Sequence, residues 1–130
     1  MVADIVRGSL HLHSKPDFDP TRRGILDPKA LDLAARVELI RQNPAYGQII
    51  CRCESVTEGE IIDAIRRTPG ARSLDGVKRR TRAGMGRCQA GFCSPRVMEI
   101  LARELGVPQS EITKSGGASK IIVGTNKDSL

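Results

Sequence analysis

Cysteine is the residue type most able to carry chemistry in this sequence. The chain has four cysteines, Cys51, Cys53, Cys88 and Cys93, arranged as C-x-C, then 34 residues, then C-x4-C. Four thiolates suit Zn²⁺ or an iron–sulfur cluster, because both are soft-ligand sites of tetrahedral metal. Structural zinc sites usually space paired cysteines two to four residues apart, whereas a two-iron cluster needs one thiolate pair for each iron. The spacing therefore favours a [2Fe–2S] cluster, with Zn²⁺ and a disulfide or redox dithiol as alternatives.

Helix starts are predicted close to both cysteine pairs. Thr57 and Glu60 form a capping box a few residues after Cys53, and a Ser-Pro start at Ser94 directly follows Cys93. Helix N-termini carry partial positive charge and free N–H donors. Two such ends are expected to offset the net −2 charge of a four-thiolate [2Fe–2S] cluster, or the equal charge of a zinc–tetrathiolate site.

The segment around the second pair, GMGRCQAGFC, has three glycines in ten residues. Glycine lets a chain wrap closely around a bulky ligand and turn through positive φ. Phe92 lies between Cys88 and Cys93. It is predicted either to shield a cluster from water or to belong to the core.

The elements expected to position the cysteines are mainly helical. A helix is predicted to start at Asp27-Pro28 and to run to about Gln42, and a short extended segment leads to Cys51. Three further helices are expected, starting at Thr57, at Ser73 and at Ser94, the last ending at Gly106. The apolar segment 121–123 could add one strand. The predicted fold is a small, mainly α, helix-turn-helix-like module with an extended N-terminal arm.

Composition limits the size of the core and the class of protein. Of the 130 residues 39% are hydrophobic, but only 2% are aromatic, so a thin aliphatic core is expected. The sequence has no apolar run long enough for a transmembrane helix, and its first residues, MVADIVRGSLHLH, do not resemble a secretory signal. A cytoplasmic location is therefore expected, where clustered cysteines more often serve metal or redox chemistry than structural disulfides.

One window of the chain is strongly basic. Residues 66–87 contain eight basic residues and a single acidic one, Asp75. The window could offset the charge of a cluster and dock an acidic partner, or be no more than a solvated surface. A basic nucleic-acid-binding domain is an alternative, but no aromatic residue is interleaved for base stacking, so nucleic acid is not the expected partner. The basic residues are Arg66, Arg67, Arg72, Lys78, Arg79, Arg80, Arg82 and Arg87.

Two stretches, IICRCESVTEGEIIDAIRR and LDGVKRRTRAGMGRCQAGFCSPRVMEILARELG, resemble the bacterioferritin-associated-ferredoxin-like [2Fe–2S] domain. They are most similar to the form found at the C-terminus of FAD-dependent oxidoreductases related to the catalytic subunit of anaerobic glycerol-3-phosphate dehydrogenase. The resemblance is dense over about residues 36–118, and RQNPAYGQIICRCE and AGMGRCQAGFCSPRV are its most specific parts. Stand-alone ferredoxins of this fold use C-x2-C as the second pair, whereas the oxidoreductase-linked branch shows the C-x4-C found here.

The resemblance implies that Cys51, Cys53, Cys88 and Cys93 ligate the cluster. It also implies four segments: residues 1–26 as the end of a flavin domain or a linker arm, 27–44 as a connecting helix, 45–115 as the four-cysteine module and 116–130 as a tail.

The implied function is electron relay within a flavin-dependent dehydrogenase. FAD and catalysis would belong to another part of the parent enzyme, since this chain has no GxGxxG dinucleotide-binding motif. Electrons would pass from the flavin domain to an external acceptor, such as a quinone pathway, a ferredoxin or a membrane subunit. The enzyme would then be cytoplasmic, or peripheral to the inner membrane through a partner. A zinc-stabilised interaction module without a redox role is the main alternative.

Overall fold

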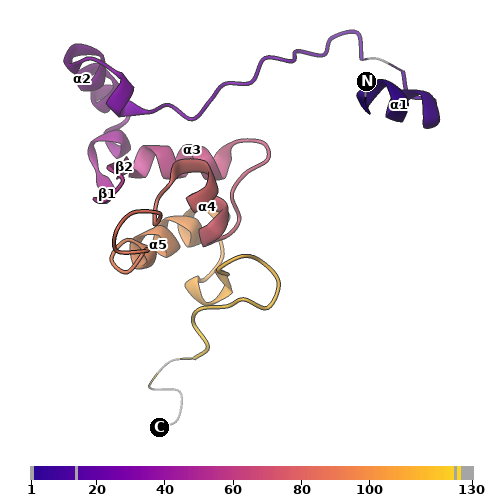
Figure 1. Cartoon of the computed structure of the whole chain (residues 1–130). Helices are drawn as coiled ribbons and strands as arrows, with labels where there is room; N and C mark the ends of the chain where they lie inside the picture. Colours follow the sequence, from indigo (N-terminus) through magenta and orange to yellow (C-terminus); the bar gives the residue numbers. More distant parts are fainter. Residues whose placement is uncertain (1, 14, 125, 127–130) are drawn as a thin grey trace.

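The computed structural model describes residues 2–13, 15–124 and 126, and it shows a helical module preceded by an extended arm (Figure 1). Among these residues the only paired strands form one two-stranded sheet. The mainly α fold predicted from the sequence is thereby confirmed. In chain order the elements are α1 (Val2–Ser9), η1 (Pro28–Ala30), α2 (Leu33–Gln42), η2 (Pro44–Gly47), β1 (Ile49–Cys51), β2 (Val56–Thr57), α3 (Glu58–Arg66), α4 (Leu74–Thr81), α5 (Ser94–Leu105) and η3 (Gln109–Glu111).

The three predicted helix starts in the module are confirmed. Thr57 and Glu60 form the expected capping box of α3, and the Ser73 side chain accepts a hydrogen bond from the amide of Gly76 at the start of α4. Helix α5 begins at Ser94-Pro95 and ends at Gly106, which adopts φ +66°. Local capping signals therefore define the helical frame of the module.

The helix predicted to start at Asp27 begins later than expected. The Asp27 side chain caps only the short 3-10 turn η1, and Leu31 returns to an extended conformation. Asp32 then caps α2 by accepting a hydrogen bond from the amide of Ala35. Two caps thus compete within six residues, and the second one starts the α-helix.

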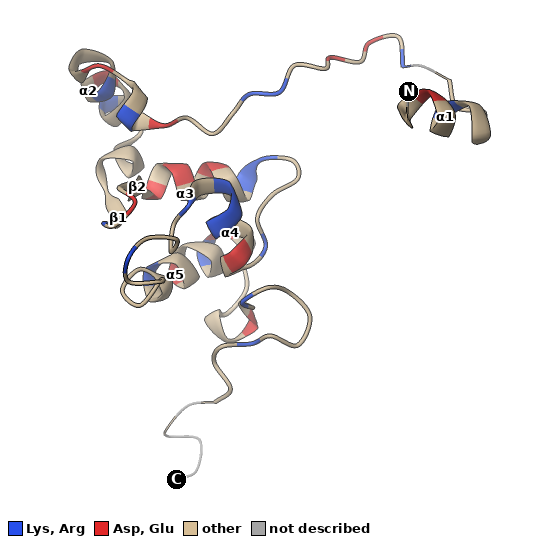
Figure 2. Cartoon of the chain, in the orientation of Figure 1, with Lys and Arg blue, Asp and Glu red and all other residues tan. Residues whose placement is uncertain are grey.

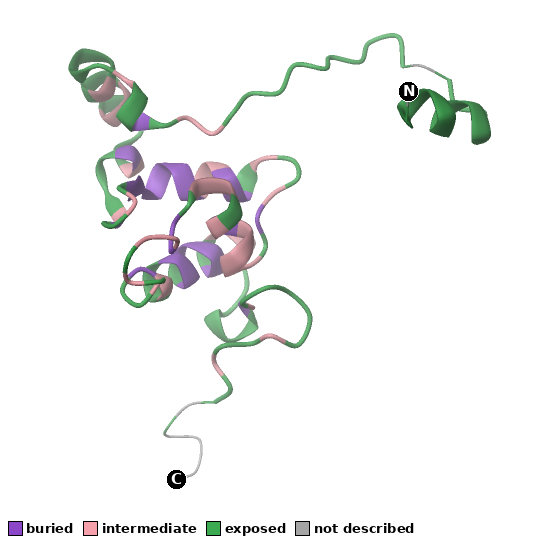
Figure 3. Cartoon of the chain, viewed as in Figure 1, coloured by how far each residue is buried: buried purple, intermediate pink, exposed green. Residues whose placement is uncertain are grey.

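The core lies between α3, α4 and α5 (Figure 3). Its largest fully buried side chains are aliphatic, with the thiol of Cys51 beside them, so the absence of aromatic residues from this cluster agrees with the composition. Tyr46 packs at the edge, against Gly59, where a Cβ would lie only 2.6 Å from the tyrosine ring. The fully buried residues are Ile61, Ile100, Leu101, Ile112, Val56, Val77 and Cys51.

The arm before the module contacts it through polar groups. Arg23 forms an ion pair with Asp63 of α3 at 2.5 Å, and Arg67 donates to the carbonyl of Arg23. Helix α1 has no buried residue, and its apolar side chains are exposed. None of the described helices has the length and apolar character needed to cross a bilayer.

The residues after η3 form a turn instead of a strand. Thr113 and Lys120 make an isolated antiparallel bridge across Gly116 and Gly117, both of which have positive φ. The described backbone at 121–123 pairs with no strand, so the expected strand there is wrong. Of its apolar residues, Ile122 is partly buried and packs against the core.

Candidate metal centre

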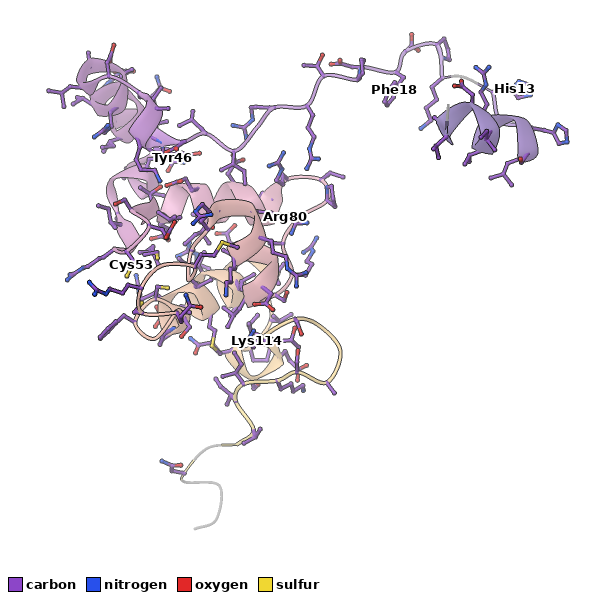
Figure 4. The ribbon with its side chains drawn as sticks, in the orientation of Figure 1. His13, Phe18, Tyr46, Cys53, Arg80 and Lys114 are labelled. Atoms are coloured by element: carbon purple, nitrogen blue, oxygen red, sulfur yellow. The ribbon has the colours of Figure 1, made fainter. Side chains whose placement is uncertain are left out.

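Two segments far apart in sequence bring the four cysteines to one open pocket of about 630 Å³. Cys51 ends β1 and Cys53 lies in the turn between the two strands, at the surface of the module where Figure 4 labels it. Cys88 lies in the loop after α4, and Cys93 immediately precedes α5. All four cysteines predicted from the sequence therefore line the same site. Its other lining residues are Gln48, Ile49, Ile50, Arg52, Phe92 and Arg96.

The thiols pair across the two motifs instead of within them. The Sγ atoms of Cys53 and Cys88 are 3.6 Å apart, and Cys93 lies close enough to Cys51 for that thiol to raise its pKa. Two sulfurs on one tetrahedral metal with bonds of about 2.3 Å would lie about 3.8 Å apart, so the first pair already has the spacing of ligands to a common atom. No disulfide joins these cysteines.

The two pairs differ in burial. Cys51 and Cys93 are 1% and 3% exposed and belong to the core cluster, whereas Cys53 is exposed and Cys88 half-buried. In the described part of the chain, no three Cys, His, Asp or Glu side chains converge on a single ion-binding point. An inner and an outer thiol pair fit two metal atoms, one for each pair, better than one ion held by all four sulfurs. The donor set thus fits a [2Fe–2S] cluster.

Backbone geometry holds the two cysteine segments in close contact. Gly84, at φ +86°, donates its amide to the Sγ of Cys51 at 3.5 Å. A Cβ on Gly86 would lie 2.3 Å from the Cβ of Cys53, so only glycine fits there without displacing its neighbour. The glycines predicted to let the chain wrap a ligand therefore also bring the second segment against the first.

An ion pair that was not predicted from the sequence joins the same segments. Arg82, which ends α4 in the left-handed conformation, donates from Nε to Glu54 Oε2 at 2.7 Å. Lys29 of the arm donates to the carbonyl oxygen of the same glutamate at 3.1 Å. The position of Glu54 next to Cys53 was the one sequence feature that pointed to a role at the site. Its partners Arg82 and Lys29 are distant in the sequence, so the sequence pattern could not identify them.

Among the helices that the structure describes, α5 begins directly after a cysteine. Cys93 is the N-cap residue of α5 and makes no side-chain cap, while the amide of Ser94 donates to the carbonyl of Ala90. At the start of α3 two backbone amides already have hydrogen-bond partners. The Glu60 carboxylate accepts from the amide of Thr57, and the Thr57 hydroxyl accepts from the amide of Glu60. The amides of Thr57 and Glu60 therefore already have partners, and the expectation that two helix N-termini face the site stays a prediction.

Figure 2 marks basic residues at the end of α3 and along α4, within the predicted basic window. Some of these side chains form ion pairs and others are exposed. Arg66 pairs with Glu104 of α5 and Arg82 with Glu54, which ties helices and loops together. Arg79 and Arg87 are exposed, so part of the window remains available to solvent. Phe92 is 86% exposed, so the core role considered for it is wrong.

The thiols of the metal-free site differ in acidity. Hydrogen bonds from the backbone amide of Phe92 and from Cys53 lower the pKa of Cys88. Burial, followed by the proximity of Cys51, raises the pKa of Cys93 to about 11. At neutral pH the Cys93 thiol is consequently protonated, and metal binding must displace its proton.

Alkylation of metal-free protein is expected to follow this order. Because the thiolate is the nucleophile, Cys88 should react with iodoacetamide at pH 7.5 well before Cys93. Raising the pH toward 9 should reduce the difference between the two alkylation rates. Cys88 is then already largely ionised and gains little, whereas the thiolate fraction of Cys93 still rises. Peptide mass spectrometry after timed quenching measures both rates. Equal rates for Cys88 and Cys93 at pH 7.5 would contradict this order of acidity. Labelling in denaturant, where the folded environment is lost, is the control.

The comparisons with known proteins agree with this site. Residues 49–103 match the model of the BFD-like [2Fe-2S] binding domain. The chain is 52% identical over 132 residues to a glycerol 3-phosphate dehydrogenase of Caloramator mitchellensis, an alignment that covers 99% of the chain and 27% of that protein. No solved structure matches the chain significantly.

Two further relatives match shorter stretches. The hydrogen cyanide synthase subunit HcnB of Pseudomonas aeruginosa is 43% identical over 74 residues, 54% of this chain and 15% of that protein. One subunit of the anaerobic glycerol-3-phosphate dehydrogenase of Escherichia coli is 42% identical over 58 residues, 45% of this chain and 10% of that protein. The chain thus spans about a quarter or less of the length of these relatives. The resemblance stated from the sequence is confirmed: residues 49–103 match the BFD-like [2Fe-2S] binding domain, within a chain similar to one segment of a glycerol 3-phosphate dehydrogenase.

Proposed function

We propose that Cys51, Cys53, Cys88 and Cys93 bind one [2Fe–2S] cluster and that the module relays single electrons. The observation that carries the proposal is the meeting of all four thiols in one pocket of a domain that matches a [2Fe-2S] family. When bound, such a cluster supplies a site that takes up and releases one electron at a time. Neither the geometry nor the comparisons favour the zinc alternative.

The protein's own groups would tune this site. The Gly84 amide donates toward the Cys51 sulfur, and hydrogen bonds to ligand sulfurs stabilise the more negative reduced state and so raise the reduction potential. Burial of Cys51 and Cys93 keeps water from the inner pair, while the exposed Cys53 leaves the outer pair near the surface. Electrons would therefore enter and leave the cluster at the outer pair.

We further propose that the chain is the electron-relay segment of a flavin-dependent dehydrogenase. Similarity over 99% of the chain to a protein named glycerol 3-phosphate dehydrogenase supports this. FAD and the substrate site, with glycerol 3-phosphate as the first candidate, would lie in the larger remainder of such a protein. The flavin domain would be the donor, and a further protein, at the inner membrane or free, the acceptor. The segment boundaries 1–26, 27–44, 45–115 and 116–130 remain predictions within this proposal.

Anaerobic purification of the full chain tests the cluster assignment. We expect a coloured protein with two iron and two sulfide per chain, visible absorbance bands, and an electron paramagnetic resonance signal that appears on one-electron reduction. Colourless protein that contains one zinc per chain, prepared without oxygen in iron-supplemented cells, would overturn the redox proposal in favour of a zinc-stabilised interaction module.

A further inference from the structure

The rim of the cysteine pocket exposes apolar side chains. Phe92 is 86% exposed and Ile49 is 58% exposed, and both line the pocket that holds the four thiols. Phe92 lies in the loop between Cys88 and Cys93, whereas Ile49 opens the strand that leads to Cys51. Single exposed apolar residues are common on proteins, but apolar groups that flank one functional opening from two segments indicate a contact surface.

The charged part of this rim is entirely basic. Arg52 and Arg96 line the pocket, and none of its ten lining residues in the described chain is acidic. Arg87 is exposed next to Cys88. Arg96 pairs with Glu99 one turn along α5, whereas Arg52 and Arg87 have no ion-pair partner in the part of the chain that the structure describes.

These arginines differ from the basic groups that tie the module together. Arg66, Arg82 and Arg103 each pair with an acid on another element. Arg52 and Arg87 instead project from the two cysteine loops without such a role. Their charges are thus available to an acidic surface, with Arg52 at the pocket and Arg87 directly before Cys88 in the chain.

We propose that this face, formed by Ile49, Arg52, Arg87, Phe92 and Arg96, docks an electron-transfer protein whose redox centre opens at an acidic surface with an apolar middle. The inference rests on the proposed function and adds the partner's chemistry and the place of contact. Phe92 would enter the apolar middle, and the arginines would meet carboxylates around it. Interfaces between redox proteins are small, commonly below about 1,200 Å², so a contact made by a few side chains around one opening is in keeping with this class of complex. One electron then passes between the partner's centre and the cluster through the outer, exposed thiol pair, and no bond is formed or broken.

Stopped-flow reduction of the full chain, reconstituted with its cluster, tests the docking face. The probe is chemically reduced flavodoxin, a small acidic flavoprotein that donates one electron to the oxidised cluster. We expect Arg52→Glu, Arg87→Glu and Phe92→Ala each to lower the second-order rate constant about tenfold at low salt. Raising the ionic strength to about 0.3 M should erase most of the difference between the wild type and the charge variants, because exposed charges are then screened.

Matched substitutions outside the face separate docking from general effects. Arg79→Glu changes charge equally on the exposed part of α4, and Phe18→Ala removes a 69% exposed phenylalanine from the arm. Both should leave the rate within about twofold of wild type. Equal slowing by Arg79→Glu, or unchanged rates in all three face variants, would overturn the docking proposal.

Cluster content distinguishes this failure from that of the proposed function. Each variant is checked for iron content, visible spectrum and reduction by dithionite before the flavodoxin experiment. Absence of any cluster in wild-type protein would refute electron relay itself. If every variant holds a full cluster and the face variants are reduced as fast as wild type, only the docking face is refuted.

Discussion

Replacing Cys88 with serine is expected to abolish stable cluster binding. The hydroxyl of serine is nearly isosteric with the thiol but does not ionise near neutral pH, so it is a poor ligand for iron. The Sγ of Cys88 lies 3.6 Å from that of Cys53 and completes the outer pair. With one ligand missing, the iron content after anaerobic purification should fall by at least about tenfold.

The same substitution should destabilise the module by several kcal/mol relative to cluster-loaded wild type. Binding that exists only in the folded state adds to folding free energy, and the variant loses that contribution. The control is metal-free wild type, prepared with a chelator, which should unfold at nearly the temperature of metal-free Cys88→Ser because the thiol itself is only half-buried. Thermal unfolding followed by circular dichroism measures the stability of loaded wild type, metal-free wild type and Cys88→Ser. A loaded wild type no more stable than the serine variant would contradict a structural role for the cluster.

Features encoded by neighbouring residues could be predicted from the sequence. The capping box at Thr57 and Glu60, the Ser73 cap and the Gly106 terminus each depend on side chains within a few positions. The four cysteines were identifiable because two closely spaced thiol pairs are typical of soft-metal sites. The start of α2 was misplaced because Asp27 and Asp32 are both good caps, and local signals do not decide between them.

Features that depend on contacts between distant segments could not be predicted in this way. The pairing of Cys53 with Cys88 and of Cys51 with Cys93 follows from how β1 and the 82–93 loop meet, not from the spacing within each motif. The Glu54–Arg82 ion pair likewise joins residues 28 apart in sequence. The exposure of Phe92 depends on which side of its loop faces solvent, and a sequence pattern with one aromatic residue does not specify that side.

Gly86→Ala is expected to have an effect comparable to the loss of a ligand, although it removes no sulfur. The added Cβ would lie 2.3 Å from the Cβ of Cys53 and 3.3 Å from a carboxylate oxygen of Glu54. Carbon atoms in contact prefer about 3.5–4.0 Å, so the two cysteine segments must separate by more than an ångström. Gly86 does not have positive φ, so the clash alone, not backbone strain, is tested.

Separation of the segments should act on the outer thiol pair first. Cys53 and Cys88 approach across this contact, and a displacement of that size would misplace one sulfur relative to a metal held by the other. Overpacking of this kind typically costs about 1–3 kcal/mol in folding free energy, but the loss of cluster should be larger, because ligand geometry tolerates little error. We expect less than about a tenth of wild-type iron content, together with a circular dichroism spectrum that retains its helical signal.

Two other glycines provide a graded comparison. A Cβ on Gly91 would lie 3.2 Å from the carbonyl oxygen of Cys88, a tight contact that a small shift can relieve, whereas a Cβ on Gly24 would meet nothing within 4 Å. Cluster content should therefore fall in the order Gly24→Ala, Gly91→Ala, Gly86→Ala, with Gly24→Ala equal to wild type. Measured iron and sulfide per chain give this order directly. Full loading of Gly86→Ala would show that close contact between the two segments is not needed, and the site would then have to assemble from loops that the cluster itself draws together.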